Sequence, residues 1–290
     1  MHNLYTVFTR VLNICKSLSS EKLNKNNNIP RRGPVPAFSD LEIISLSLSS
    51  EMLGINSELH LFRIIHADFS DCFKRLGGRR NFNERRKNLF SLTNDFRLKM
   101  TRHIEANPEV FCVDSMPLPI CKNARAKRSK ICRDISSSFP TFGFCASQNM
   151  HYFGYKLHAV CSSQGIIYDM DMSQANVHDI NYLNDLKGNL NNCILVGDKG
   201  DLSAQMQVDL FTHYKVHLEV PYRKNQINRK PVRKDYQKLR RRIETNFSQL
   251  EDQLCIRRNY AKTQRGLFTR ILSKIVHCNI KCNMEQRSLT

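Results

Sequence analysis

The sequence predicts a mixed α/β fold preceded by an all-helical region, and three observations support this prediction. Apolar residues recur at helical spacing through the first 105 residues. After Pro108, short apolar segments with strand-like alternation replace that spacing, and helices return only between them. The net charge also changes along the chain: it is +6 over residues 1–109, zero over 110–222 and +13 over 223–290, within a total of +19.

The N-terminal region contains four expected helices separated by polar turns. Residues 1–20 are interpreted as the first helix rather than a transit peptide, because they lack a serine-rich and arginine-rich character. Ser39 and Glu42 have the spacing of a capping box, and Gly54 closes the helix that they open. The same pattern recurs over residues 56–69 and 81–106. The helices around 40–66 have the shape of a helix-turn-helix motif, although helical pairs joined by glycine also occur for other reasons.

Beyond Pro108 we expect three successive strands, then helix, strand, helix and strand, and then a final helix. The strands are expected at 110–118, 154–162, 165–173, 192–198 and 216–221, and the helices at 177–190, 203–214 and 239–254. A basic, Pro-containing insertion at 222–238 interrupts this order. Successive strands followed by strands that alternate with helices indicate a mixed sheet.

The composition restricts the class of function. A basic excess of this size favours a polyanionic partner, most commonly DNA or RNA, over a merely basic protein. The 11 Cys residues stand singly, mostly in apolar stretches, and no CxxC pair occurs. This pattern argues against a zinc site and indicates a reducing, intracellular compartment. No apolar run approaches the roughly 18 residues of a membrane span, so the sequence excludes an integral membrane protein.

Two apolar strands each lead into an acid, at Asp114 and at Asp198. If these strands are parallel neighbours, their carboxylates emerge side by side at one edge of the sheet, where ligands of α/β sheets gather. Two carboxylates repel each other in water, but a divalent cation between them stabilises the pair, and Mg²⁺ prefers oxygen ligands.

A third carboxylate, Glu244, stands at the edge of a basic cluster. Ile243, Phe247, Leu250 and Leu254 form an apolar stripe on a helix, and Glu244 lies beside that stripe. Arg240 and Arg241 lie one turn before it and share its side of the helix. A metal-binding carboxylate next to guanidinium groups suits a phosphodiester and supports two-metal phosphoryl transfer. The alternative is a solvated ion pair, with both aspartates merely ending strands.

Several stretches closely resemble bacterial insertion-sequence transposases of the DDE type, and the nearest resemblance is to the family numbered nine-eight-two. They include VDSMPLPICKNARAKR, YFGYKLHAVCSSQG, NCILVGDKG, VPYRKNQ and RRRIETNFSQLEDQ, which keep the same order as in that family. FSDLEIISLSL and RRNFNERRKNL extend the resemblance over nearly the whole chain.

The resemblance implies a ribonuclease-H-like catalytic domain at 108–290 behind a helical DNA-binding region at 1–107. It makes Asp114, Asp198 and Glu244 the catalytic and metal-binding acids, with two Mg²⁺ or Mn²⁺ ions. The implied activity cuts double-stranded DNA at the ends of the element and joins the 3′-hydroxyls to target DNA. We expect a homodimer or larger assembly in a bacterial cytoplasm, associated with the nucleoid.

Three departures from the family pattern leave other functions open. The family usually carries an aromatic residue after GDKG, where this chain has Asp201; in addition, Glu251 stands where related transposases have Lys, and the signature tyrosine is displaced by one place to Tyr236. A catalytically inactive, sequence-specific DNA-binding remnant is therefore the alternative. A nuclease or resolvase on the same fold is a third hypothesis.

We also predict which cations contact DNA. They are Arg125, Lys127, Arg128, Lys130, Lys156, Lys199, Arg223, Lys224, Arg240, Arg241 and Arg242. His158 shares a strand face with Lys156 and either contacts DNA or is a satisfied polar neighbour. His178 and Asp179 either form a catalytic pair or begin a helix, where the aspartate would complement the helix dipole. Asp169 and Asp171 are expected on the polar face of their strand.

Overall fold

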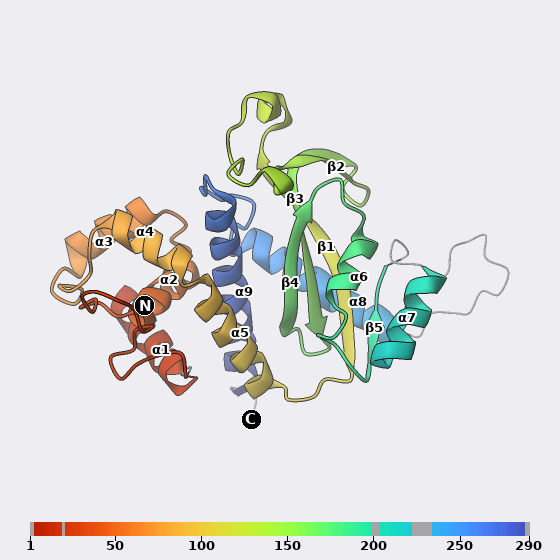
Figure 1. The fold of residues 1–290 in the computed structure, drawn as a ribbon, viewed down its shortest axis with the longest axis horizontal. Helices are drawn as coiled ribbons and strands as arrows, with labels where there is room; N and C mark the ends of the chain where they lie inside the picture. The colour runs from red at the N-terminus through yellow and green to blue at the C-terminus, as the bar shows by residue number, and fades with distance from the viewer. Residues whose placement is uncertain (1–2, 19–20, 199–202, 222–233, 288–290) are drawn as a thin grey trace. The chain divides into compact units, whose positions relative to one another are not determined.

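The computed structural model describes residues 3–18, 21–198, 203–221 and 234–287 (Figure 1). The chain divides into two compact units. The helical unit comprises residues 1–104 and 250–283, and the sheet unit comprises residues 105–249 and 284–290. The segment 250–283 therefore belongs to the same compact unit as the N-terminal helices, although it lies far from them in the sequence.

The helical unit is built around one nearly fully buried helix. Its helices are α1 Leu4–Ser17, α2 Asp40–Met52, α3 Glu58–Asp68, α4 Arg79–Asn88, α5 Phe90–Ile104 and most of α9 Gln264–Arg287. In α2 every residue from Asp40 to Glu51 is buried except Glu42. The predicted capping box is confirmed, because Ser39 Oγ accepts from the Glu42 amide while the Glu42 carboxylate accepts from the Ser39 amide.

The prediction of one long helix over 81–106 is wrong. The chain forms two helices, and Leu89 between them has φ −90° and ψ 11°, outside the helical range. Leu89 is buried, so the break places its side chain in the core rather than on a continuous helical face. Local spacing does not register such a break, because both halves keep a helical pattern.

The sheet unit contains the predicted mixed sheet. Its strands are β1 Val110–Cys121, β2 Thr141–Cys145, β3 Met150–Ser162, β4 Ile167–Gln174, β5 Cys193–Val196 and β6 Val216–Glu219. The central strand β1 pairs antiparallel with β3 and parallel with β5, and β6 continues the parallel side. Strands β4 and β2 pair with successive parts of β3 on its other edge. This mixed α/β arrangement fits the expected ribonuclease-H-like fold; β2 was not anticipated.

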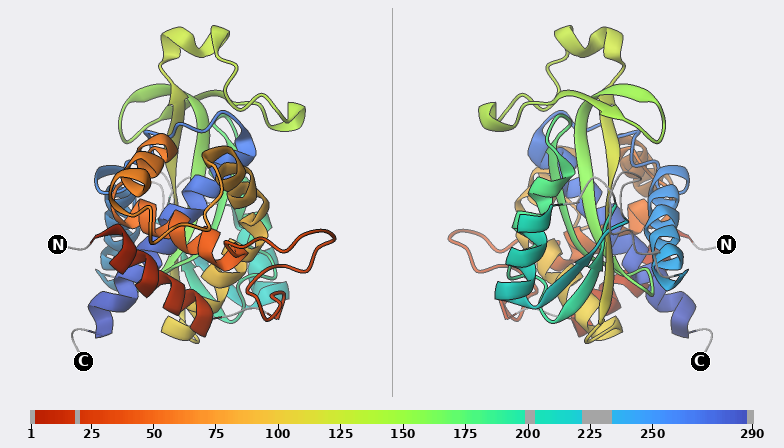
Figure 2. Two further views of the ribbon diagram at one scale, coloured as in Figure 1. Left: turned by 90° about the vertical axis from the view of Figure 1, so that its left-hand side faces the viewer. Right: turned by 90° about the vertical axis from the view of Figure 1, so that its right-hand side faces the viewer.

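Helices cover both faces of this sheet (Figure 2, right). One face carries η3 Asp179–Asn181, α6 Tyr182–Asp185 and α7 Ala204–Tyr214 over a core that includes Val113, Val160 and Leu195. The opposite face carries α8 Lys234–Asp252. Since side chains alternate along a strand, neighbouring residues of β1 project toward different helices.

Gly154 allows β3 to approach β1 closely. A Cβ at this position would lie 2.2 Å from the Leu118 carbonyl oxygen, which belongs to the backbone and cannot move aside. We expect Gly154→Ala to lower the free energy of unfolding by more than about 2 kcal/mol, as overpacking does. Gly78→Ala is the control, because a Cβ there meets no atom within 4 Å. Chemical denaturation of both variants tests this, and equal stability would contradict it.

Candidate active site

The register of β1 and β5 brings two of the predicted acids together. Cys112 pairs with Val196 in parallel register, and Asp114 and Asp198 each follow two residues later. Asp114 projects to the same face of β1 as Cys112, and Asp198, just beyond the end of β5, meets α8 through Arg240. The strand expected at 110–118 is slightly longer than predicted: β1 runs past Asp114 and continues to Cys121, held by antiparallel pairing with β3. Asp114 lies where the parallel pairing stops, not where its strand stops.

Helix α8 carries charged groups close to Asp198. Arg240 Nη2 lies 3.3 Å from Asp198 Oδ1, and the Asp198 side chain is 51% exposed. Glu244 follows Arg240 by one helical turn, so it occupies the same side of α8. Glu244 is exposed, whereas Ile243 and Phe247 beside it are buried. The predicted apolar stripe thus holds the helix against the protein and leaves Glu244 at its border.

The pKa of the buried Cys112 thiol is influenced by these charges. Burial raises the pKa of this thiol above its ordinary value, and Cys161 and Asp114 add to the rise. Arg240 opposes the rise and Glu244 adds to it. The charges of Asp114, Arg240 and Glu244 therefore all act on this one buried thiol.

Two polar contacts fix α8 to the sheet unit. Arg242 Nη2 donates to the Gln164 carbonyl at 2.7 Å, and Asn246 Nδ2 donates to the Gly165 carbonyl at 3.0 Å. Both acceptors belong to the turn between β3 and β4. Arg242 was predicted to contact DNA, but its guanidinium is engaged in this structural contact. Arg241 is exposed on the same helix.

A different network occupies the other face of the sheet. Asp179 Oδ1 accepts from Lys156 Nζ at 3.0 Å and from Ser115 Oγ at 3.1 Å. Lys156 Nζ also donates to the Val177 carbonyl, and its side chain is only 16% exposed. Lys156 was predicted to contact DNA, yet these bonds commit its ammonium to the protein. Because Ser115 projects away from Asp114, this network lies on the face opposite the candidate site.

His158 is a satisfied polar neighbour within this network. Its Nε2 lies 2.7 Å from Ser173 Oγ, and its ring stacks on Tyr182 at 4.9 Å between centroids. Its Nδ1 lies 3.9 Å from Asp179 Oδ1. His178 instead caps η3, since its Nδ1 accepts from the Ile180 amide, which agrees with the helix-start interpretation of this pair.

The buried imidazole of His158 predicts a loss of stability in acid. Burial lowers its pKa to about 4 against the raising effect of Asp179, and Lys156 lowers it further. Unfolded histidine has a pKa near 6.5, so the unfolded chain binds more protons between pH 6.5 and 4. The stability is therefore complete above about pH 6.5 and falls by about 2 kcal/mol at pH 5. Hydrogen exchange of the β3 amides at pH 7 and 5 measures this fall, which His158→Gln should remove; an equal fall in the variant would contradict it.

The predicted basic loop is exposed and anchored. Arg125, Lys127, Arg128 and Lys130 are all exposed, and the first three lie in the short helix η1 Asn123–Arg128. Asn123 Nδ2 donates to the His151 carbonyl, and the buried Tyr155 hydroxyl donates to the Ser138 carbonyl at 2.9 Å. These bonds attach both ends of the segment 123–138 to β3, so the exposed cations belong to an anchored segment.

The donor chemistry of the site fits a divalent cation, but the described residues do not form a closed metal site. Among residues 3–18, 21–198, 203–221 and 234–287, no group of three His, Cys, Asp or Glu side chains is arranged to hold a metal ion. Asp114 and Asp198 supply carboxylate oxygens, which are the kind of ligand that Mg²⁺ prefers. The Asp198 carboxylate already pairs with one cation, the guanidinium of Arg240. The predicted Lys199, Arg223 and Lys224, and the departure at Asp201, lie outside the described residues.

Sequence reasoning missed the structural role of three groups. It did not anticipate that Arg242 and Asn246 bind the β3–β4 turn, or that Cys112 is buried close to Asp114. The position of Cys112 could have been predicted, because residues two apart on a strand project to the same face. No helix of the described chain is long and apolar enough to cross a membrane.

Comparison with known proteins places residues 105–249 of the sheet unit and residues 250–280 of the helical unit in one family. The family described as "Transposase DDE domain" matches residues 105–280, which is more than half of the chain. The search of curated proteins gave no match.

Proposed function

The chain belongs to the transposase DDE domain family, and we propose that it cuts DNA at the ends of its own insertion sequence and joins the 3′-hydroxyls to target DNA. Membership makes it a transposase in general; the cutting and joining steps are the proposal. The observation that supports it is the parallel register of β1 and β5, in which Asp114 and Asp198 each follow the last pair by two residues, together with the contact between Asp198 and Arg240 on the helix that bears Glu244.

In this proposal Asp114, Asp198 and Glu244 hold two Mg²⁺ or Mn²⁺ ions. When bound, such ions lower the pKa of an attacking water or 3′-hydroxyl and stabilise the leaving oxygen. Arg240 holds the Asp198 carboxylate in place and offers its remaining N–H groups to the neighbouring phosphate. Arg241, Arg125, Lys127, Arg128 and Lys130 are exposed cations that suit contacts with the DNA backbone.

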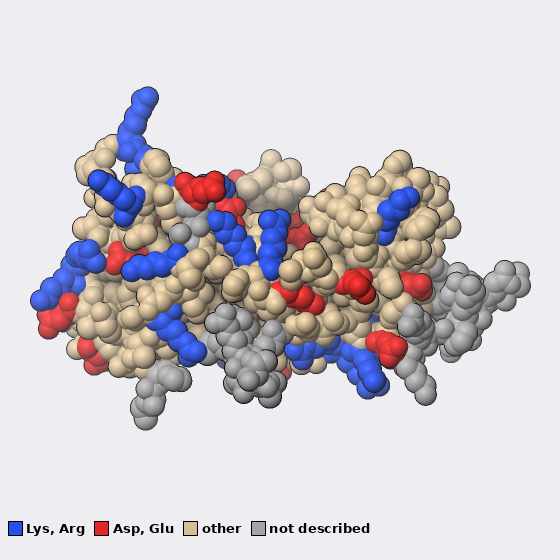
Figure 3. Space-filling model, turned by 90° about the horizontal axis from the view of Figure 1, so that it is seen from below, with Lys and Arg blue, Asp and Glu red and all other residues tan. Residues whose placement is uncertain are grey.

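The helical unit binds DNA in this proposal, and two copies of the chain act together in the bacterial cytoplasm. Two element ends must be brought together for transposition, which requires at least a dimer. The basic excess supports the choice of DNA as partner, because neutralised phosphates release counterions. Figure 3 shows Lys and Arg side chains interspersed with Asp and Glu on one face of the protein.

A cleavage assay tests the proposal. Labelled duplex carrying the repeats that flank the gene is incubated with the protein and Mg²⁺ or Mn²⁺, and nicks at the element boundary are mapped. We expect nicking by the wild-type chain and a loss of about 100-fold or more in Glu244→Gln. Glu251→Gln is the matched control on the same helix, since Glu251 pairs with Arg257 at 2.9 Å and should leave nicking unchanged.

The two other hypotheses give different outcomes in the same assay. Specific binding to the repeats without nicks would identify an inactive DNA-binding remnant. Metal-dependent cuts at positions unrelated to the element ends would identify a general nuclease or resolvase. Retained nicking by Glu244→Gln would remove this residue from the catalytic acids.

A further inference from the structure

The helical unit contains a strongly positive hollow that the candidate active site does not include. Its volume is about 250 Å³, and segments far apart in the sequence line it: the start of α3, helix α4, and the loop 260–263 with the start of α9. Its lining includes five cations against a single carboxylate, Glu58. The cations are Arg79, Arg86, Lys87, Lys262 and Arg270.

The buried cations of this hollow outnumber the buried carboxylates around them. Glu58 Oε1 accepts from both Arg86 at 2.7 Å and Arg270 at 3.3 Å, while Glu58 Oε2 accepts from Asn83. Arg86 and Arg270 are 4% and 6% exposed. The next carboxylate, Glu51, is already paired with Lys274. Three buried cations thus share two carboxylates, which leaves one positive charge removed from water and without a counterion.

Arg86 points to a missing acceptor. Its Nε is buried, and in the part of the chain that the structure describes no acceptor reaches it. Burial lowers the pKa of Arg86, and repulsion from Arg270 lowers it more than Glu58 raises it. A buried guanidinium donor without a partner, on the wall of a hollow, is a position that a bound anion would complete.

Helix ends add to the positive potential. The hollow is lined by the N-cap Ser57 of α3, the first residue Arg79 of α4, and Thr263 and Gly266 at the start of α9. The N-cap of α4 is Gly78, which makes no side-chain capping bond, so the first amides of this helix receive no such acceptor. Helix N-termini carry partial positive charge and bind phosphate readily.

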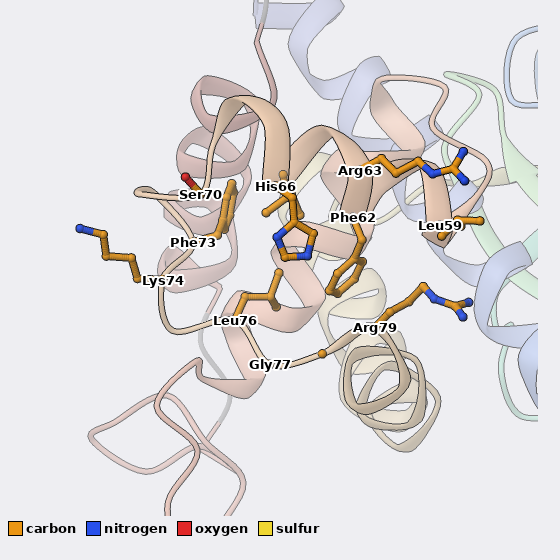
Figure 4. A pocket seen from close by; sticks show the side chains of 12 residues that line it. Leu59, Phe62, Arg63, His66, Ser70, Phe73, Lys74, Leu76, Gly77 and Arg79 are labelled. Atoms are coloured by element: carbon orange, nitrogen blue, oxygen red, sulfur yellow. The ribbon is translucent and has the colours of Figure 1, made fainter.

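The surface around the hollow extends the positive charge. Arg79 and Leu59 also line a neighbouring hollow, and Figure 4 shows Arg63 and Arg79 extending toward the same side as Leu59. On the other side, Tyr260 is 64% exposed and Lys262 is exposed. An exposed tyrosine next to cations suits a nucleic-acid backbone, because its hydroxyl donates to phosphate and its ring packs on sugar or base.

We propose that this hollow binds a phosphodiester group of the DNA backbone, with Arg79 and Lys262 at its mouth, Arg86 at its base and Tyr260 against the adjacent nucleotide. The inference rests on the proposed function for the choice of DNA and adds a second contact region to it. The site exists only when loop 260–263 packs on α3 and α4, so the C-terminal segment helps to build a DNA-binding surface from N-terminal helices.

The test measures binding of a labelled random-sequence 30-base-pair duplex as a function of salt. The variant Arg79→Gln/Lys262→Gln removes two exposed cations without touching the buried pairs. We expect about 10-fold weaker binding at moderate salt and a salt slope reduced by about two, one for each lost phosphate contact. Tyr260→Ala should weaken binding about 5-fold without changing the slope.

The control variant is Arg10→Gln/Arg102→Gln, which removes two exposed cations of α1 and α5 outside the hollow. Its net charge equals that of the test variant, so a general charge effect would move both alike. Equal binding by the two variants would overturn the inference. Circular dichroism confirms that both remain folded.

Inorganic phosphate distinguishes the sources of the anion. If calorimetry shows phosphate binding that Arg79→Gln/Lys262→Gln abolishes, while duplex binding stays unchanged, the hollow is a free-anion site and the DNA assignment fails. The nicking assay separates this inference from the proposed function. The variant should nick normally once DNA exceeds its weakened Kd. A chain that binds through the hollow yet never nicks would contradict only the proposed function.

Discussion

Asp114→Asn is expected to reduce metal-dependent nicking by about 100-fold or more while leaving the protein folded. Asparagine keeps the shape of the side chain and its acceptor for the Ser115 amide, which Asp114 Oδ1 engages at 2.8 Å. It removes the negative charge that follows the last parallel pair of β1 and β5 by two residues. A loss of about 3 kcal/mol in transition-state stabilisation corresponds to a factor of about 100 in rate.

Asp179→Asn is the control for Asp114→Asn, because it should reduce stability without reducing the nicking rate. Asp179 approaches the strand residue next to Asp114, but from the opposite face, where it pairs with Lys156 and Ser115. Its replacement should lower the free energy of unfolding by about 1–2 kcal/mol, because Lys156 loses a charge-assisted bond in a largely buried place. The nicking rate per folded molecule should stay within about 3-fold of wild type.

The measurement compares single-turnover nicking with chemical denaturation for both variants. Loss of nicking in Asp179→Asn without loss of stability would restore the catalytic interpretation of the His178–Asp179 pair. Full nicking by Asp114→Asn would show that the aligned acids are not the catalytic ones. Each result concerns one face of β1, so the two outcomes are independent.

The strands that lead into Asp114 and Asp198 could be predicted because strand patterning is local. Short apolar runs that lead into an acid, separated by a helical segment, favour parallel neighbours, and the register of β1 with β5 agrees. The capping box of Ser39 and Glu42 could also be predicted, because that motif depends on four consecutive residues only.

Other features depend on residues that meet only after folding. Lys156 and Asp179 are 23 positions apart, and nothing in the strand pattern shows that the ammonium turns to η3 rather than to DNA. The continuation of β1 past Asp114 depends on its pairing with β3. The grouping of 250–283 with the N-terminal helices depends on packing between the two ends of the chain. Local periodicity carries none of this information.

The grouping of the two ends of the chain leads to the largest expected effect on stability. Lys274 of α9 is 1% exposed, and its Nζ donates to the Glu51 carboxylate of α2, to Asn56 Oδ1 at 3.0 Å and to the Leu254 carbonyl at 2.7 Å. We expect Lys274→Met to lower the free energy of unfolding by about 3–5 kcal/mol, because the equally buried Glu51 keeps its charge without its direct ion-pair partner. Urea denaturation followed by helical circular dichroism measures this loss.

The matched control lies two turns further along α9. Lys281 Nζ donates to Gln253 Oε1 at 2.9 Å in an exposed setting, so Lys281→Met removes the same charge and adds the same side chain. Its cost should stay below about 1 kcal/mol, as for other exposed polar contacts. Similar losses in the two variants would show that the Lys274–Glu51 pair is no better than a surface contact.

A double variant, Glu51→Met/Lys274→Met, identifies the source of the loss. If the cost of Lys274→Met comes from an unpaired buried carboxylate, removing that carboxylate as well should recover most of the stability. Recovery should remain incomplete, because the Leu254 carbonyl and Asn56 Oδ1 still lose their donor, at about 1–3 kcal/mol for a buried acceptor. A double variant as unstable as the single one would instead assign the cost to those two acceptors, and α9 would then be held through the backbone at Leu254 rather than through its charge.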